Sequence, residues 1–190
     1  LKGIKEAERA GFTPIKINCV VQRGVNDRSI VELARYFKES NHIVRFIEYM
    51  DVGNRNGWKL DQVVSAAEIA NRIDTDMPIE PIKKSYPGEV ATRYRYRDGS
   101  GEIGVIASVT KPFCDNCTRL RLSPEGKLYT CLFATKSTDL LKPLRSGATD
   151  DEILSIVRNI WNIRVDRYSE ERSFLSKPVG KKVEMYHIGG

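Results

Sequence analysis

Several features that define whole classes of proteins are absent from this 190-residue sequence. No stretch approaches the roughly 18 uninterrupted apolar residues of a membrane-spanning helix, and the N-terminus lacks the basic-then-apolar pattern of a secretory signal. Cysteine is scarce, and four cysteines are too few to form a disulfide scaffold. We therefore expect a cytoplasmic protein, with no membrane partner, whose clustered thiols hold metal rather than pair with one another.

The composition is that of a soluble globular protein, with 41% hydrophobic and 29% charged residues. The length fits one ordinary domain or two small ones. The net charge of +6 favours anionic partners, but so small an excess does not predict nucleic acid. The chain begins at Leu1 within an amphipathic pattern, and we expect a fragment of a longer protein.

The first 50 residues alternate between helical and strand patterns. Gly11 provides a helix end, and Asn26 or Asp27 can cap the following helix. Strand, helix and strand in this order predict parallel pairing with a right-handed crossover. We predict an α/β fold made of the last βα units of an incomplete (β/α) barrel, because a full barrel needs roughly 250 residues. The predicted elements are a helix over 2–10, a strand over 15–21, a helix over 29–40 and a strand over 42–50.

The pattern changes after Gly57 to short helices and antiparallel hairpins. We predict two domains, with residues 1–60 as the C-terminal part of the barrel and residues 61–190 as an α+β domain that carries the metal site. The predicted elements are a helix over 65–73 with a Ser65–Glu68 capping box, hairpins around the turns 98–101 and 123–126, and a helix capped by Thr149 and Glu152.

Three of the four cysteines lie within one short segment. Cys114 and Cys117 form a C-x2-C pair, which brings two thiols close together. With a turn at 123–126, Thr118 faces Cys131, and opposed residues in a sheet lie about 5 Å apart. The spacing therefore predicts that three thiols converge as a metal site.

Two simpler interpretations stay open for these thiols. Free cysteines are often small buried hydrophobes, and a structural zinc site is possible but normally has four protein ligands. The candidates for a fourth zinc ligand are poor, because His42 and His187 are remote in sequence. Cys19 and Lys16 point to opposite faces of their strand, so Cys19 faces the helices if Lys16 faces the barrel interior. We favour a cuboidal iron–sulfur cluster held by three thiolates, which leaves one iron open to another ligand.

Two arginines follow the cysteine pair directly. Arg119 and Arg121 share one face of a predicted strand, where they could simply form an exposed cationic surface. Guanidinium groups also bind phosphates and purine edges with forked donors. Beside an open iron they would make a site for an anionic substrate.

These segments resemble one enzyme family. FCDNCTRLRLSPEGKLYTCLF, together with PIKINCVVQRGVND, RFIEYM and the terminal IGG, is similar to the C-terminal half of the GTP 3′,8-cyclases. These are radical S-adenosylmethionine enzymes that begin molybdenum cofactor biosynthesis, and the resemblance covers essentially the whole chain. It implies an enzyme with two [4Fe-4S] clusters, S-adenosylmethionine as cofactor, GTP as substrate and a homodimeric full-length form.

The resemblance also implies roles for individual residues. It implies no catalytic residue in this portion of the enzyme. Its implied site residues are Cys114, Cys117 and Cys131 as ligands of the second cluster, Lys16, Arg119, Leu120 and Arg121 as GTP contacts, and Met50 as an S-adenosylmethionine contact.

One family motif is missing from the chain. No C-x3-C-x2-C pattern is present, and Cys19 does not have the spacing to supply it. We therefore expect the first cluster to belong to a missing N-terminal barrel half, and the fragment alone to be inactive. Gly189 and Gly190 resemble the family's tail, which reaches toward an active site, although a disordered chain end is an equal interpretation.

Two other functions fit parts of the pattern. One is a different radical S-adenosylmethionine protein with an auxiliary cluster, although such proteins carry more cysteines. The other is a zinc-stabilised nucleic-acid-binding module that uses Arg93, Arg95 and Arg97, which alternate with tyrosines. The same alternation is typical of a solvated edge strand.

Overall fold

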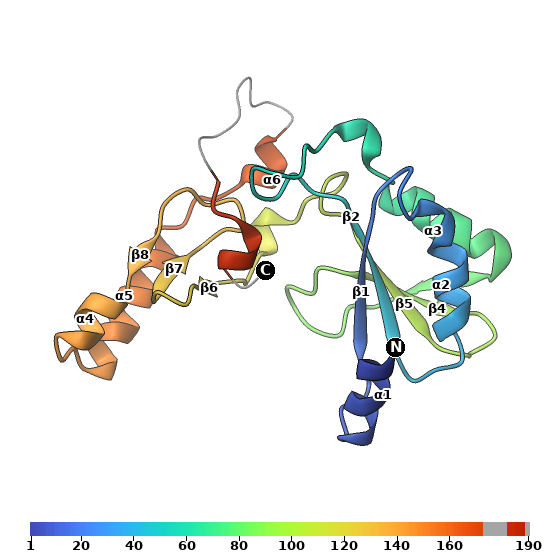
Figure 1. Ribbon diagram of the computed structural model, residues 1–190, viewed down its shortest axis with the longest axis horizontal. Coiled ribbons are helices and arrows are strands. Elements are labelled where there is room, and N and C mark those ends of the chain that lie inside the picture. The colour runs from blue at the N-terminus through green and yellow to red at the C-terminus, as the bar shows by residue number, and fades with distance from the viewer. Residues whose placement is uncertain (173–181, 189–190) are drawn as a thin grey trace. The chain divides into compact units, whose positions relative to one another are not determined.

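The computed structural model describes residues 1–172 and 182–188 (Figure 1). The chain divides into two compact units. The first contains residues 1–50 and 59–112, and the second contains residues 51–58 and the described residues from 113 onward. The sequence predicted a barrel part over 1–60 and a cluster-binding domain over 61–190. That division stays a prediction.

The first unit is built on a five-stranded sheet in the order β1-β2-β5-β4-β3. The pairings β1–β2 and β2–β5 are parallel, whereas β5–β4 and β4–β3 are antiparallel. The mixed α/β class predicted from the sequence is confirmed. The strands are β1 (Lys16–Val21), β2 (Ile43–Glu48), β3 (Ile79–Ile82), β4 (Thr92–Tyr96) and β5 (Glu102–Ile106).

Two helices, α2 (Ile30–Phe37) and α3 (Ala66–Asp76), lie along one side of this sheet (Figure 1). Their apolar residues and the alternate residues of the strands form the core, which includes Ile30, Phe46 and Ile73. Cys19 packs against this core, on the helix side of the sheet as predicted. The unit also contains the helix α1 (Lys2–Arg9) and the short 3-10 helices η1 (Asp27–Ser29) and η2 (Leu60–Gln62).

The predicted cap of α2 is wrong. The side chain of Asn26 accepts from the Gln22 N–H at 2.8 Å, and that of Asp27 accepts from the Gly24 N–H at 2.7 Å. Both side chains therefore stabilise the turn after β1, and neither caps the helix.

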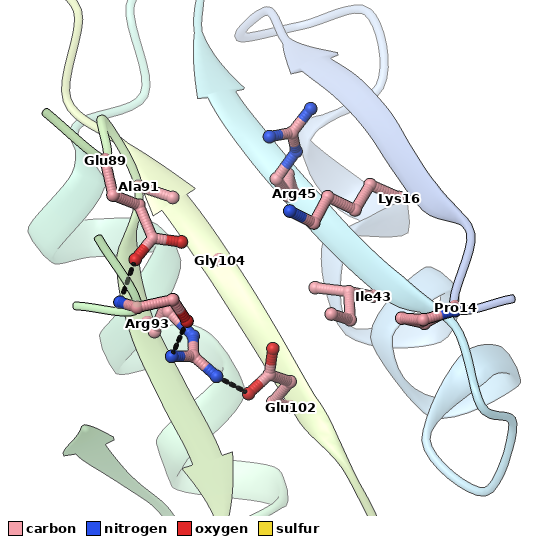
Figure 2. Close-up of a pocket in the computed structure, with 10 residues that line it drawn as sticks. Pro14, Lys16, Ile43, Arg45, Glu89, Ala91, Arg93, Glu102 and Gly104 are labelled. Carbon is pink, nitrogen blue, oxygen red and sulfur yellow. Dashed lines mark hydrogen bonds and ion pairs between the residues drawn. The ribbon is translucent and has the colours of Figure 1, made fainter. Parts of the chain in front are cut away.

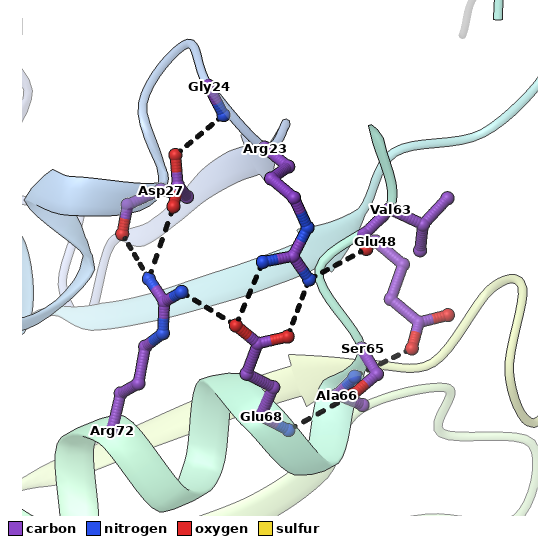
Figure 3. A network of polar contacts seen from close by, with 9 residues as sticks. All are labelled: Arg23, Gly24, Asp27, Glu48, Val63, Ser65, Ala66, Glu68 and Arg72. Carbon is purple, nitrogen blue, oxygen red and sulfur yellow. Dashed lines mark hydrogen bonds and ion pairs between the residues drawn. The ribbon is translucent and has the colours of Figure 1, made fainter. Parts of the chain in front are cut away.

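The predicted capping box of α3 forms only in part. The Ser65 hydroxyl accepts from the Glu68 N–H at 3.1 Å, but the Glu68 carboxylate pairs with Arg23 and Arg72, each at 2.6 Å (Figure 3). Arg72 also contacts Asp27. This network ties the turn after β1 to the first turns of α3.

A buried carboxylate joins the end of β2 to two other segments. Glu48 is fully buried and accepts hydrogen bonds from the backbone N–H groups of Ala66 at 2.7 Å, Val109 at 2.7 Å and Thr110 at 2.8 Å. The Thr110 hydroxyl also donates to it. Each carboxylate oxygen is thus satisfied by donors from the protein itself.

The second unit is organised around a small antiparallel sheet, β6-β7-β8. The helix α5 begins at Thr149 with the complete predicted capping box, in which Glu152 is the partner. Large buried apolar side chains are few among the described residues of this unit, and they include Leu128, Tyr129 and Phe133. Its elements are η3 (Cys114–Asn116), β6 (Arg121–Leu122), β7 (Lys127–Tyr129), β8 (Thr138–Asp139), α4 (Leu141–Arg145), α5 (Asp150–Asn162), α6 (Tyr168–Glu171) and η4 (Met185–His187).

Within the described residues, no helix has both the length and the apolar character needed to cross a membrane. Gly189 and Gly190, whose tail role the sequence leaves open, lie outside the part of the chain that the structure describes.

Candidate cluster site and nucleotide pocket

Cys114 and Cys117 lie on a single turn of 3-10 helix. Cys114 opens η3, and the Cys117 N–H donates to the Cys114 carbonyl at 3.2 Å. Cys131 follows the strand β7, and all three thiols are partly buried. The second unit therefore holds the three cysteines singled out from the sequence.

The predicted register of the cysteine hairpin is wrong by one residue. Leu122 pairs with Leu128, and Ser123 pairs with Lys127. The loop is therefore the three residues 124–126, and Gly126 closes it with a φ of 73°. The ladder ends at Arg121, so Thr118 does not pair with Cys131.

The pKa of Cys131 responds to Cys114 and Arg121, and the pKa of Arg121 responds to Cys117 and Cys131. Burial raises the pKa of Cys131, and the charges of Asp166 and Cys114 raise it further. The Phe133 N–H and the charge of Arg121 act to lower this pKa, but they do not outweigh burial. Burial and the charge of Arg119 lower the pKa of Arg121, while Cys117 and Cys131 act to raise it. Arg121 is thus a partly buried cation near two of the three thiols.

The thiol of Cys117 differs from that of Cys131. Burial would raise the Cys117 pKa, but the backbone and side chain of Arg119 and the charge of Arg164 outweigh it, and the pKa is lowered. This environment favours the thiolate, which is the form that binds metals.

Within the described residues, the three thiols do not form a site for a single metal ion. In residues 1–172 and 182–188, no group of three or more cysteine, histidine, aspartate or glutamate side chains could hold one metal ion. The Phe133 N–H donates to the Cys131 Sγ at 3.4 Å, a contact of the kind that tunes cluster sulfurs. Cys114, Cys117 and Cys131 are the residues that an iron–sulfur cluster would use, and this assignment stays a prediction.

The segment Arg119, Leu120 and Arg121 connects the cysteine pair to β6. Arg119 is exposed, and its guanidinium lies 5.0 Å from the ring centroid of Phe113. Leu120 and Arg121 are partly buried. The two arginines therefore present one accessible cation and one partly buried cation next to the thiols.

Two residues that the sequence does not single out, Arg164 and Glu170, hold the cysteine pair in place. Arg164 donates to the carbonyls of Cys114 and Cys117, and Glu170 accepts from the Cys114 N–H. In sequence both lie in a run of charged residues that resembles a solvated surface, so no local signal distinguishes them.

Lys16 lines a pocket of about 250 Å³ on the side of the sheet opposite the helices (Figure 2). Arg45, from the neighbouring strand, reaches toward the same space, and its Nε donates to the Asn18 side chain at 2.8 Å. Glu102 and Arg93 form an ion pair at 2.6 Å on another wall. The sequence analysis missed Arg45, although it alternates with the buried Val44 and Phe46, a pattern that places it on the open face.

Met50, the predicted S-adenosylmethionine contact, follows the C-terminal end of β2 and is partly buried. It belongs to the first unit with Lys16, while the cysteines and Arg119 to Arg121 belong to the second. The assignment of these residues to ligands stays a prediction.

Two of the three arginines of the alternative nucleic-acid module are engaged within the protein. Arg93 pairs with Glu102 at 2.6 Å, and Arg95 pairs with Glu80 at 2.5 Å. Their strand β4 lies between β5 and β3, so it is not the solvated edge strand suggested by the sequence. Ion pairing of this kind leaves less charge for a nucleic-acid backbone.

A protein-family model defines the class of proteins that share this fold and cysteine arrangement. Residues 42–170 match the Molybdenum Cofactor Synthesis C family, and the chain belongs to it.

Individual relatives match the chain from end to end. The GTP 3′,8-cyclase of Acidothermus cellulolyticus is 50% identical, with 100% of this chain and 59% of the relative covered. Those of Xanthomonas axonopodis pv. citri and Staphylococcus carnosus are each 47% identical, with 100% of this chain and 56% of the relative covered. The chain therefore spans somewhat more than half the length of these curated relatives.

Proposed function

We propose that this chain is the substrate-binding C-terminal portion of a GTP 3′,8-cyclase. That enzyme uses S-adenosylmethionine and two [4Fe-4S] clusters to convert GTP to (8S)-3′,8-cyclo-7,8-dihydroguanosine 5′-triphosphate, the first step of molybdenum cofactor biosynthesis. The observation that carries the proposal is the identity of 46–50% along the whole chain to relatives of that name. The three grouped cysteines in the family's domain support it chemically.

Cys114, Cys117 and Cys131 would bind three irons of the second cluster. The lowered pKa of Cys117 and the N–H contact to the Cys131 sulfur support this role. When bound, the cluster supplies an open iron, a Lewis acid that can take a ring atom of guanine.

Arg119, Leu120 and Arg121 would form the part of the GTP site next to the cluster. Arg121 is partly buried, so an anionic ligand there gains more than it would in bulk water. Arg119 is accessible and has a planar fork suited to phosphate oxygens. The chain's own role at this site is to bind and orient the nucleotide.

Lys16 and Arg45 would form a second cationic surface for GTP phosphates. Both line one pocket, and neither has an ion-pair partner recorded within the described residues. Lysine and arginine facing a common space repel one another, and an anion between them removes that cost.

The remaining features concern the full-length protein. Met50 would contact S-adenosylmethionine, and the sheet of the first unit would be the end of a radical S-adenosylmethionine barrel completed by an N-terminal half. The first cluster would belong to that half, and the full-length enzyme would act as a homodimer in the cytoplasm. The chain by itself would not turn over GTP, because it lacks the C-x3-C-x2-C motif.

Anaerobic reconstitution with iron and sulfide tests the proposal. The chain should bind about four irons, and Cys131→Ser should lose most of them. Cys19→Ser is the matched control, because Cys19 packs against the core of the first unit, and it should bind as much iron as the unaltered chain. A colourless protein with one zinc, or equal losses in both variants, would overturn the assignment.

GTP binding is measured on the same preparation. Arg119→Ala and Arg121→Ala should each weaken GTP binding about tenfold while the iron content stays unchanged. Arg145→Ala, on the exposed surface of α4, is the control and should bind GTP normally. Unchanged affinity in both site variants would remove these arginines from the proposed GTP site.

A further inference from the structure

The two stretches of chain that carry the cysteines are both held by one later segment. Arg164, Asp166 and Glu170, called here the cysteine clamp, follow the helix α5 in the second unit. They contact the backbone of the Cys114–Cys117 turn and the residue that precedes Cys131.

Arg164 spans the cysteine turn with both arms of its guanidinium. Its Nη1 donates to the Cys117 carbonyl at 2.7 Å, and its Nη2 donates to the Cys114 carbonyl at 3.1 Å. The ring of Trp161 lies 4.8 Å from its guanidinium carbon, and the side chain is only 12% exposed. A planar fork held against an aromatic face fixes the separation of the two carbonyls, which a single ammonium group cannot do.

The other two members extend this hold. Glu170 accepts from the Cys114 N–H at 3.0 Å, so the clamp holds both the N–H and the carbonyl of Cys114. Asp166 accepts from the hydroxyl of Thr130, next to Cys131, at 2.6 Å and lies 3.8 Å from the Arg164 Nε. The Arg164–Asp166 pair therefore links the cysteine turn to the segment of the third thiol.

None of these hydrogen bonds uses a sulfur atom. The clamp acts on backbone and on a neighbouring hydroxyl, so the three thiols stay available for iron. Residues that orient the metal ligands before the metal binds strengthen the binding of metal centres in proteins.

We propose that Arg164 is a positioning residue for the iron–sulfur cluster, because it sets the spacing of the cysteine ligands through their backbone. The inference rests on the proposed function, since it needs a cluster on the same three cysteines. It assigns Arg164 two separable effects. The fork determines how long the cluster is retained, and the positive charge favours the reduced, more negative state of the cluster.

The test uses the reconstituted chain with Arg164→Gln, Arg164→Lys and the control Arg158→Gln, which lies on the exposed side of α5. Cluster loss to an excess of chelator should be about tenfold faster in both Arg164 variants and unchanged in the control. The midpoint potential of the surviving cluster should fall in Arg164→Gln but stay near that of the unaltered chain in Arg164→Lys. A residue that acts only on folding would not separate these two measurements.

A milder variant covers the case in which the Arg164 variants fail to fold. Thr130→Val removes the hydroxyl that Asp166 holds and leaves Arg164 intact. It should speed cluster loss several-fold at an unchanged unfolding temperature of the cluster-free chain. Cluster lifetimes equal to that of the unaltered chain in the Arg164 and Thr130 variants would overturn the inference while the proposed function stands. An unaltered chain that takes up no cluster would overturn both.

Discussion

At the scale of single residues, Glu48 is the polar group whose loss should cost the first unit most. Its carboxylate accepts from three backbone N–H groups and one hydroxyl while fully buried. Leaving such donors without an acceptor costs more than an ordinary hydrogen bond contributes, because they also lose contact with water.

Glu48→Gln should therefore lower the free energy of unfolding by about 3 kcal/mol, since the amide nitrogen would face backbone donors. Urea unfolding followed by circular dichroism measures this. Glu39→Gln, at an exposed position, is the control and should change it by less than about 0.5 kcal/mol. Coinciding midpoints for the two variants would show that Glu48 is not a structural anion.

Asp51 is expected to make the stability of the second unit depend on pH. Burial acts to raise its pKa, but hydrogen bonds from Lys182 and Tyr168 and the charges of Arg172 and Lys182 outweigh burial, and its pKa is lowered. Lys182 and Arg172 each lie 2.8 Å from its carboxylate. A carboxylate with a lowered pKa stabilises the folded state above its unfolded pKa, and this contribution is lost as the pH falls through the folded value.

Asp51→Asn should therefore destabilise the chain at pH 7, and the difference from the unaltered chain should shrink below about pH 4, near the ordinary pKa of an aspartate. Unfolding midpoints between pH 7 and pH 3 provide the measurement. A difference that is constant over this range would mean that the ion pairs contribute nothing to stability.

At the scale of elements, the loop of the cysteine hairpin sets which residues face one another. Gly126 has a φ of 73°, and a Cβ built there would lie 2.8 Å from the Leu141 Cβ. Gly24 has a similar φ of 78°, but a Cβ built there would have no atom within 4 Å. A substitution at Gly24 therefore measures backbone strain without crowding.

Gly126→Ala should thus destabilise the chain more than Gly24→Ala, which should cost about 1 kcal/mol through its backbone alone. The crowded variant should also retain less iron after reconstitution, because the hairpin leads to Cys131. Thermal unfolding and iron content are the two measurements. Equal effects of the two variants would show that the loop tolerates the side chain and that the register does not depend on it.

The sequence predicted those elements whose signals are local. The parallel pair β1–β2 with α2 between them and the capping box at Thr149 follow from periodicity and cap chemistry over a few residues. The strand β3 was missed because it contains a proline and lies beside only one other strand. The hairpin register was missed because a three-residue loop and a four-residue loop suit the same glycine.

The candidate site was predictable only in part, for a similar reason. The cysteine spacing and the arginines between them are local patterns. The clamp contacts join residues 36 to 56 positions apart, and a run of alternating charges gives no sign of which member will turn inward. The role of Arg45 likewise depends on the register of two strands.

At the scale of the whole molecule, the two units differ in how their stability arises. The hydrophobic core cluster lies in the first unit, whereas the described part of the second has few large buried apolar side chains. A small unit with little core usually depends on a metal or another cross-link for stability.

Without its cluster, the second unit should therefore unfold at lower urea concentration than the first, and reconstitution should raise its midpoint selectively. Trp58 and Trp161 are the two tryptophans and both belong to the second unit, so their fluorescence reports on it alone, while circular dichroism reports on both. A single transition that both signals share, with and without iron, would contradict this division of stability.

The central claim is that three thiolates of this chain hold a cluster whose open iron receives GTP. The most direct test is the electron paramagnetic resonance spectrum of the reduced, cluster-loaded chain, recorded with and without an excess of GTP. GTP is expected to change the spectrum of the cluster, because a guanine atom would become an iron ligand. A cluster spectrum that GTP leaves unaltered, or a chain that takes up no cluster, would contradict it.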